Sequence, residues 1–168
     1  MERCARWLAA LLRAVETAAA ACIVGLAVLV FVNVLLRYVF NLSAMALQEL
    51  QLYLYAMSFL LAIAPTLQAD GHVRIDILYA RFPQQWRQWI DAVGTLLFLL
   101  PFAGLVLWAS YDFVAYSLSI RESSPNPGGL PALYLFKALL PLSFVLLVVA
   151  AFGFLQSRLQ KPRTPSRQ

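Results

Sequence analysis

Charged residues are scarce in this chain, and their scarcity excludes an ordinary soluble domain. Asp, Glu, Lys and Arg make up 12% of the 168 residues, whereas a soluble domain carries about 25%. Apolar residues make up 62%, above the usual ~45–50%. The net charge of +5 does not come from one basic patch, because Lys and Arg lie at the two termini and in one central segment. We therefore expect membrane lipid, and no nucleic acid, as a partner.

Histidine and cysteine are nearly absent, which excludes most metal and cofactor chemistry. The chain has one histidine, His72, and two separated cysteines, Cys4 and Cys22. These residues cannot supply both axial ligands of a membrane haem, nor a zinc site built by this chain alone, and they form no disulfide framework. A glycine-rich phosphate loop, a His-x-x-x-His helix and a Gly-x-Ser-x-Gly elbow are also missing. We expect no enzyme activity and no cofactor.

What the chain does have is four long apolar runs. A membrane-spanning helix needs about 20 mainly apolar residues, and its backbone must satisfy its own hydrogen bonds in lipid. We predict an all-α integral membrane four-helix bundle that forms one domain over residues 1–160, followed by a basic tail at 161–168. Uncharged runs of suitable length lie at 17–36, 50–69, 92–111 and 138–157. The corresponding predicted spans are about 15–37, 47–69, 90–116 and 135–157.

Two segments around the first run admit other structures. Arg3, Arg6 and Arg13 ahead of an apolar block are typical of a signal peptide. The block is long, however, and ends in Leu36-Arg37 rather than in small residues, so we expect an uncleaved helix. Residues 38–48 are apolar enough to lie flat on the membrane surface as a short interfacial helix between spans one and two.

The distribution of Lys and Arg predicts the orientation. The N-terminal tail, the segment between spans two and three and the C-terminal tail together carry ten of these residues, and the other side carries three. Basic residues concentrate in cytoplasmic segments. Both termini are therefore predicted to lie in the cytoplasm, and an even number of spans agrees with termini on the same side.

The four runs contain no ionisable residue. A protein that moves ions or charged solutes usually keeps such residues within its spans, although each costs ~2.5–3.5 kcal/mol on insertion scales. The polar residues present, such as Asn33, Ser58 and Ser143, can be satisfied by helix backbone or by a neighbouring helix. We therefore expect a non-catalytic subunit that packs against other membrane helices and transports nothing by itself.

Polar residues at the predicted outer ends of the first two spans are candidates for structural or partner contacts. Arg37 with Asn41 either anchors the end of span one to an acidic group or reaches the lipid headgroups. Glu49 begins span two, where a carboxylate is favourable by ~0.3–1 kcal/mol because of the helix dipole. A bridge from Glu49 to Arg37 would explain Glu49 equally well.

Two further clusters flank the later spans. In the segment after span two, His72, Arg74 and Asp76 alternate with apolar residues, either as a polar clasp or as a solvated loop. A catalytic role for His72 is disfavoured because no nucleophile or metal ligand accompanies it. Gly129 and Pro131 form a sharp turn before span four.

These clusters, in this order, resemble the small membrane subunit of tripartite ATP-independent periplasmic (TRAP) transporters, the DctQ-type family. The matching segments cover about residues 15–156. The family often has two adjacent glutamates before span two, and this chain has Gln48 at the first of these positions. The residues that carry the resemblance are Arg37-Tyr-Val-Phe-Asn41, Glu49, His72-Val-Arg-Ile-Asp76 and Gly129-Leu-Pro131 with Pro141.

The resemblance implies a subunit of the bacterial inner membrane that binds a large membrane subunit, which carries the sodium and substrate sites. A periplasmic substrate-binding protein would capture a carboxylate-containing solute. The small subunit would act as a scaffold that enlarges the fixed part of the transporter while the transport domain of the large subunit moves. It would itself hold no cofactor.

Two other functions remain alternatives. A small exporter that works as a dimer needs a carboxylate within a span, and Glu49 is the nearest candidate. A membrane anchor for a redox or other enzyme needs cofactor ligands, and only His72 is available for that role.

Overall fold

The computed structural model describes residues 2–68 and 83–160, which form helices and connecting segments without a strand. The described residues contain four helices long and apolar enough to cross a membrane, which confirms the all-α four-helix fold. The helices are α1 (Glu2–Val39), α2 (Met45–Gln68), α4 (Gln84–Gly94), the π-helical turn η1 (Thr95–Leu99), α5 (Leu100–Ser119) and α6 (Leu133–Gln160).

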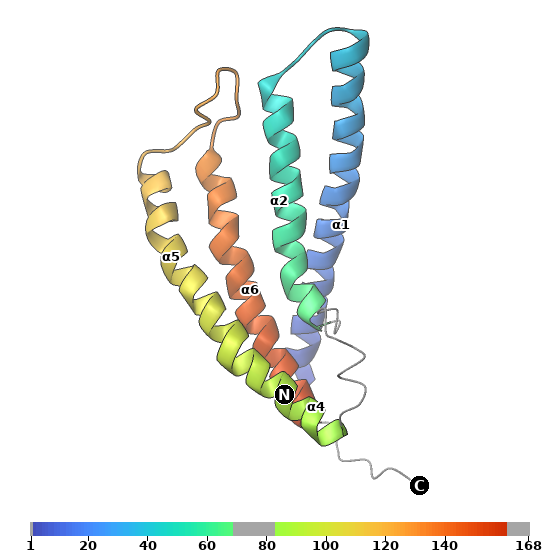
Figure 1. Ribbon diagram of the computed structural model, residues 1–168, viewed down its shortest axis with the longest axis vertical. Helices are drawn as coiled ribbons and strands as arrows, with labels where there is room; N and C mark the ends of the chain where they lie inside the picture. The colour runs from blue at the N-terminus through green and yellow to red at the C-terminus, as the bar shows by residue number, and fades with distance from the viewer. Residues whose placement is uncertain (1, 69–82, 161–168) are drawn as a thin grey trace.

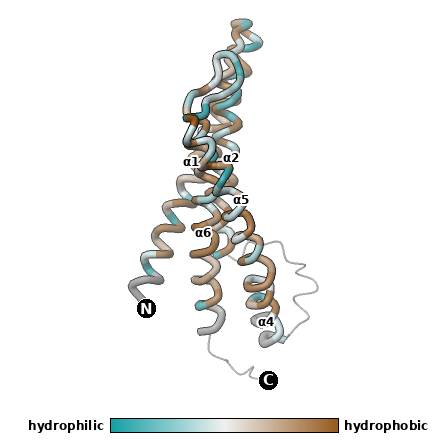
Figure 2. The backbone as a smooth tube through the Cα atoms, turned by 90° about the vertical axis from the view of Figure 1, so that its left-hand side faces the viewer, coloured by the Kyte–Doolittle hydropathy of each residue, from teal (hydrophilic) through white to brown (hydrophobic). Residues whose placement is uncertain are grey.

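The four long helices lie side by side in the order α1, α2, α6, α5 (Figure 1). The α1–α2 and α5–α6 hairpins meet through α2 and α6, which leaves α1 and α5 at the two edges. We call the end with the α1–α2 and α5–α6 connections the loop end, and the opposite end the terminal end. Figure 2 shows the helices overlapping at the loop end and spreading apart toward the terminal end, with apolar residues along their length.

The first helix is longer than the predicted span. It begins at Glu2 and has 38 residues, or about 57 Å at 1.5 Å per residue, more than the ~30 Å of bilayer hydrocarbon. Packing explains part of the extension, because Leu12 is only 3% exposed and belongs to one core cluster with Ala64 and Leu67 of α2. The Cβ of a residue replacing Gly153 of α6 would lie 2.6 Å from Leu8, so α1 also approaches α6 closely here.

The prediction of a short interfacial helix at residues 38–48 is wrong. Helix α1 continues to Val39, residues 40–44 are irregular, and α2 already begins at Met45. Asn41 has a φ of 53°, a left-handed conformation that asparagine tolerates where a helix ends. The amide of Leu42 donates to the carbonyl of Leu36 at 2.9 Å. The chain therefore reverses in a tight turn that has no room for an additional helix.

The third span is one continuous helical segment made of α4, η1 and α5. Its π-helical turn ends two residues before Pro101, which has no backbone N–H to donate to the carbonyl four residues earlier. The amide of Leu100 instead reaches the carbonyl of Thr95, in the i→i+5 pattern of a π-helix. The altered register thus accommodates a proline inside a spanning helix.

Small residues form much of the contact between helices. Ala64 of α2, Ala103 of α5 and Ala150 and Ala151 of α6 are at most 1% exposed. In lipid, such residues allow helix backbones to approach closely, and packing between the helices then supplies much of their association energy. Phe144 and Leu147 of α6 complete this cluster between the two hairpins.

A polar link between α1 and α2 supplements this packing. The side-chain amide of Gln51 donates to the carbonyl of Leu29 at 3.2 Å, and its oxygen accepts from Asn33 at 3.4 Å. Replacing Gln51 by leucine should reduce the free energy of unfolding by about 0.6–1.7 kcal/mol, the range measured for polar links between membrane helices. Thermal unfolding in detergent would measure the effect. Thr66→Val is the control, because the Thr66 hydroxyl donates to the carbonyl of Ala62 in its own helix; equal effects would contradict the link.

Candidate functional site

The loop end is held together by the carboxylate of Glu49, in the first turns of α2. One oxygen, Oε1, accepts hydrogen bonds from Ser124 Oγ and, at 2.9 Å, from Asn126 Nδ2. The other, Oε2, accepts from the backbone amide of Leu130 at 2.7 Å. Glu49 is only 8% exposed. One buried side chain of α2 therefore fastens the whole connection between α5 and α6, and we call these four residues the Glu49 clamp.

Gly129 makes room for this carboxylate. A Cβ at this position would lie 2.7 Å from Glu49 Oε1 and 2.6 Å from Ser124 Cβ, distances that real Cβ atoms do not reach. Its amide donates to the carbonyl of Asn126 at 3.0 Å, which closes the turn. Glycine is needed here because any side chain would enter the space that the clamp occupies.

Further hydrogen bonds within the connection keep the donors of the clamp in place. The Ser124 amide donates to the Leu130 carbonyl at 3.1 Å, and the Asn126 amide donates to Ser124 Oγ at 3.1 Å. Prolines at 125, 127 and 131 fix several φ angles of the segment. The connection therefore loses little conformational entropy when it binds Glu49. Beneath it, the stacked rings of Tyr53 and Phe136, 3.9 Å between centroids, join α2 to α6.

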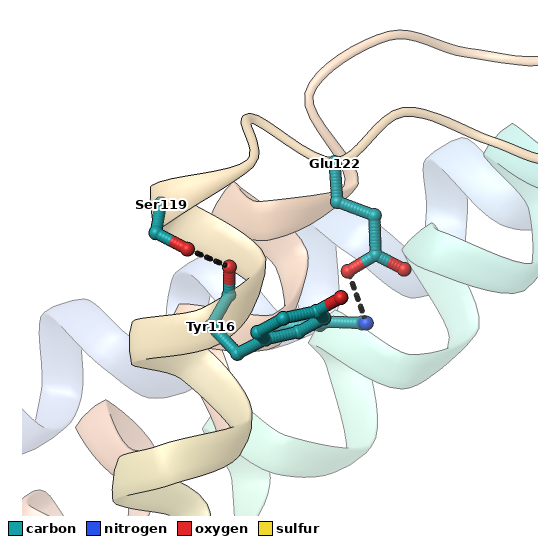
Figure 3. A network of polar contacts seen from close by, with 4 residues as sticks. Tyr116, Ser119 and Glu122 are labelled. Carbon is teal, nitrogen blue, oxygen red and sulfur yellow. Dashed lines mark hydrogen bonds and ion pairs between the residues drawn. The ribbon is translucent and has the colours of Figure 1, made fainter.

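A second charged contact lies on the α5 side of this connection. Glu122 forms an ion pair with Lys137 of α6, whose Nζ also lies 4.3 Å from the centre of the Phe113 ring. Figure 3 shows Glu122 leaving the connection above the last turn of α5, where Ser119 Oγ donates to the Tyr116 carbonyl at 2.7 Å. The hydrogen bond from Lys137 lowers the pKa of Glu122 below its ordinary value of 4.5.

The shifted pKa of Glu122 predicts a pH dependence of stability. Because the folded-state pKa is lower than the ordinary 4.5, the ion pair stabilises the fold above pH 4.5 and loses its effect as the pH falls through the folded-state value. Wild type should unfold at a higher temperature than Glu122→Gln at pH 7, and the difference should shrink below pH 4.5. Unfolding midpoints in detergent from pH 7 to pH 3 would measure this. A difference that is constant across the range would contradict the assignment.

The structure brings some of the sequence-predicted residues together and separates others. Glu49 and Gly129 meet in the clamp, and Pro131 follows the amide that Glu49 binds. Arg37 is exposed in the last turn of α1, and no ion pair joins it to Glu49 among the residues described. Asn41 ends α1 through its left-handed conformation. The remaining candidates, His72, Arg74 and Asp76, lie outside the described residues.

Sequence reasoning missed Ser124 and Asn126. Both lie in the Ser-Ser-Pro-Asn-Pro segment, which has the composition of an ordinary turn. No local sequence pattern indicates that this segment contacts a glutamate at the start of a helix far away in the sequence. The only available signal was that a carboxylate lies near one helix end and that polar donors lie in a connection expected on the same side of the membrane.

The clamp is suited to holding structure rather than to catalysis. Both oxygens of Glu49 are occupied by donors of the same chain. Within residues 2–68 and 83–160, no group of three or more His, Cys, Asp or Glu side chains could hold a metal ion.

Comparison with known families decides what kind of protein carries this architecture. The model for the family described as "Tripartite ATP-independent periplasmic transporters, DctQ component" matches residues 26–161. This chain belongs to the DctQ family. The match takes in the C-terminal part of α1, all of α2, the third span and α6, together with every residue of the Glu49 clamp. No curated protein matches the chain.

Membership makes this DctQ chain a small component of a TRAP transporter, in agreement with the resemblance that its polar clusters show. The family is one of transporter components rather than of enzymes. Four membrane-spanning helices and the family together indicate a multi-pass membrane protein with partner subunits.

Proposed function

We propose that this chain is the small scaffold subunit of a TRAP transporter that imports a carboxylate-containing solute together with sodium. In this proposal it lies in the bacterial inner membrane with both termini in the cytoplasm, and it supports a large membrane subunit that carries the substrate and sodium sites. A periplasmic substrate-binding protein delivers the solute. The family match carries the proposal.

The polar residues in the middle of the spans support a scaffold role. Ser58 donates to the carbonyl of Tyr55 at 2.8 Å, and Ser143 donates to that of Leu139 at 2.9 Å. Thr95, in the third span, donates to the carbonyl of Asp91 at 2.7 Å. Each hydroxyl is used by its own helix. A sodium ion or a carboxylate needs several polar groups directed to one point, and these side chains are not so arranged.

Three paired charged groups near the loop end support the same role. Glu49 and the Glu122–Lys137 pair fasten the connection between α5 and α6 to α2 and α6. Groups that are already paired in this way rigidify an assembly and are not free to bind and release an ion in a transport cycle. A rigid body is what a moving transport domain needs as its support.

Co-purification tests the proposal directly. When the tagged chain is expressed together with the large membrane subunit of its transporter, the two should purify in detergent as one complex with equal amounts of each. The tagged chain expressed with an unrelated membrane protein of similar size serves as control. Purification of the chain without the large subunit would contradict the scaffold role.

The exporter alternative has a separate test. A self-sufficient exporter would need Glu49 to bind and release a proton, yet the clamp occupies this carboxylate with three donors. Cells that express the chain alone should therefore show no efflux of cationic drugs. Efflux that is abolished by Glu49→Gln would favour the exporter instead.

A further inference from the structure

Helix α5 is an edge of the four-helix row, and one of its sides faces away from the other described helices. Ala103, Ser110 and Ser117, spaced by seven residues, are its buried positions. The opposite side carries Leu105, which is 59% exposed, and Trp108, which is 77% exposed. Asp112 follows on the same side, because positions i, i+3 and i+7 share one face of a helix, and it is also exposed.

Asp112 differs from the other charged residues in the loop-end half of the helices α2, α5 and α6. Glu49 is held by the clamp and Lys137 by Glu122, whereas Asp112 has no hydrogen bond or ion pair with any described residue. It lies seven residues before the end of α5 at Ser119, or about 10 Å along the helix. The spanning helix that contains it runs from Trp89 to Ser119. An ionisable residue within such a helix normally has a partner.

The other edge of the row provides the contrast. Helix α1 contains no ionisable residue between Thr17 and Leu36, and its exposed side chains there are mostly apolar, such as Val24, Val28 and Phe31. Lipid solvates that surface without penalty. A carboxylate on the outward side of α5 is solvated poorly by lipid tails, so a protein partner is favoured at this edge and not at α1.

We propose that the outward side of α5, formed by Leu105, Trp108 and Asp112, is the surface that binds the large membrane subunit. Asp112 pairs there with a lysine or arginine on a membrane helix of that subunit, and Trp108 packs against the same helix. Charge complementarity favours a protein partner that carries a basic residue, because a carboxylate in a spanning helix requires a cation at the same depth in the membrane. Large aromatic side chains beside such a pair are typical of the residues that dominate binding. The inference rests on the proposed function, since it assigns the partner of that scaffold to one edge.

Charge reversal at this position tests the inference in the complex itself. The tagged full chain and the large subunit are co-expressed, and the amount of large subunit retained per tagged chain is measured for wild type, Asp112→Asn and Asp112→Lys. We expect Asp112→Lys to lower retention at least about tenfold, because two like charges then face each other. Asp112→Asn should lower it less. Glu16→Lys, the same charge reversal on an exposed residue of the other edge helix, should retain the large subunit as wild type does.

Two readouts separate the possible failures. The unfolding midpoint of the chain purified alone should be unchanged by Asp112→Lys, because Asp112 has no partner within the described residues. If wild type retains the large subunit and Asp112→Lys retains it equally, the edge assignment is overturned while the proposed function stands. If wild type itself retains none, the proposed function fails, and the inference fails with it.

A photo-crosslinker identifies the occupant. With a benzophenone-bearing residue in place of Trp108, illumination of membranes that contain the complex should join this chain to the large subunit. Crosslinks only between two copies of this chain, or only to lipid, would overturn the proposal. The same crosslinker in place of Val28 on α1 should give no adduct with the large subunit.

Discussion

Replacing Glu49 by alanine should release the connection between α5 and α6 from α2. The change removes three hydrogen bonds to a carboxylate, and it leaves the side chains of Ser124 and Asn126 and the amide of Leu130 without their acceptor. Bonds to charged groups are stronger than bonds between neutral groups, and an abandoned buried donor is costly. We expect the largest loss of local order that any single side-chain truncation in this chain produces.

Trypsin gives a direct measure of that release. Arg121 is the one trypsin site between α5 and α6, since the next basic residue is Lys137 within α6. Cleavage after Arg121 in detergent should be at least about tenfold faster in Glu49→Ala than in wild type, because local opening controls the rate of proteolysis. Glu16→Ala, which truncates an exposed carboxylate of α1, should leave the rate unchanged. A wild-type rate in Glu49→Ala would show that the clamp does not hold the connection.

Replacing Gly129 by alanine should damage the same clamp from the other side. The added methyl group would lie 2.7 Å from Glu49 Oε1 and 2.6 Å from Ser124 Cβ, so the carboxylate or the serine must move. Overpacking of this kind costs about 1–3 kcal/mol. The unfolding midpoint in detergent should fall accordingly, and cleavage after Arg121 should become faster, as in Glu49→Ala.

Gly104 provides the matched control for this substitution. A Cβ there meets nothing within 4 Å, and the residue lies inside α5, where alanine is a better helix former than glycine by about 0.5–1 kcal/mol. Gly104→Ala should therefore leave the midpoint unchanged or raise it. If Gly129→Ala behaved in the same way as Gly104→Ala, the connection would have to be more adaptable than its contacts with Glu49 and Ser124 imply.

The spans could be predicted from the sequence because membrane burial depends on length and hydrophobicity, which are local properties. The ends of α1 and the absence of an interfacial helix could not be predicted from the sequence, since both depend on packing between helices. Leu12 belongs to one core cluster with Ala64 and Leu67, which favours the longer α1. Residues 38–48 are divided between the end of α1, an irregular turn and the start of α2, because the chain reverses at Asn41.

Part of the candidate site was predictable from the sequence, but Ser124, Asn126 and the contacts that join the site were not. Glu49 and Gly129 stand out as a lone carboxylate and a tight turn. Their contact joins positions 80 residues apart, and it exists only because α2 packs against α6. A pairing of Glu49 with Arg37 was equally reasonable from the sequence, yet the donors come from Ser124, Asn126 and Leu130. Such a choice between partners is decided by helix order, which hydrophobicity alone does not encode.

The proposed scaffold role has consequences for any reconstitution. Hydroxyl groups in the middle of the spans bond to their own helices, as Ser58 and Ser143 do, and the carboxylate of Glu49 is occupied by the clamp. The proposal therefore assigns solute and sodium movement to the large subunit. In the assembled transporter, variants of the Glu49 clamp should affect assembly and stability before they affect affinity for the solute.

Uptake into liposomes tests the central claim most directly. The purified chain alone, the large subunit alone and the two together are reconstituted, and uptake of radiolabelled solute with its binding protein is measured under an inward sodium gradient. The account predicts no uptake above empty liposomes for this chain alone and sodium-dependent uptake when both subunits are present. Sodium-driven uptake by this chain alone would contradict it.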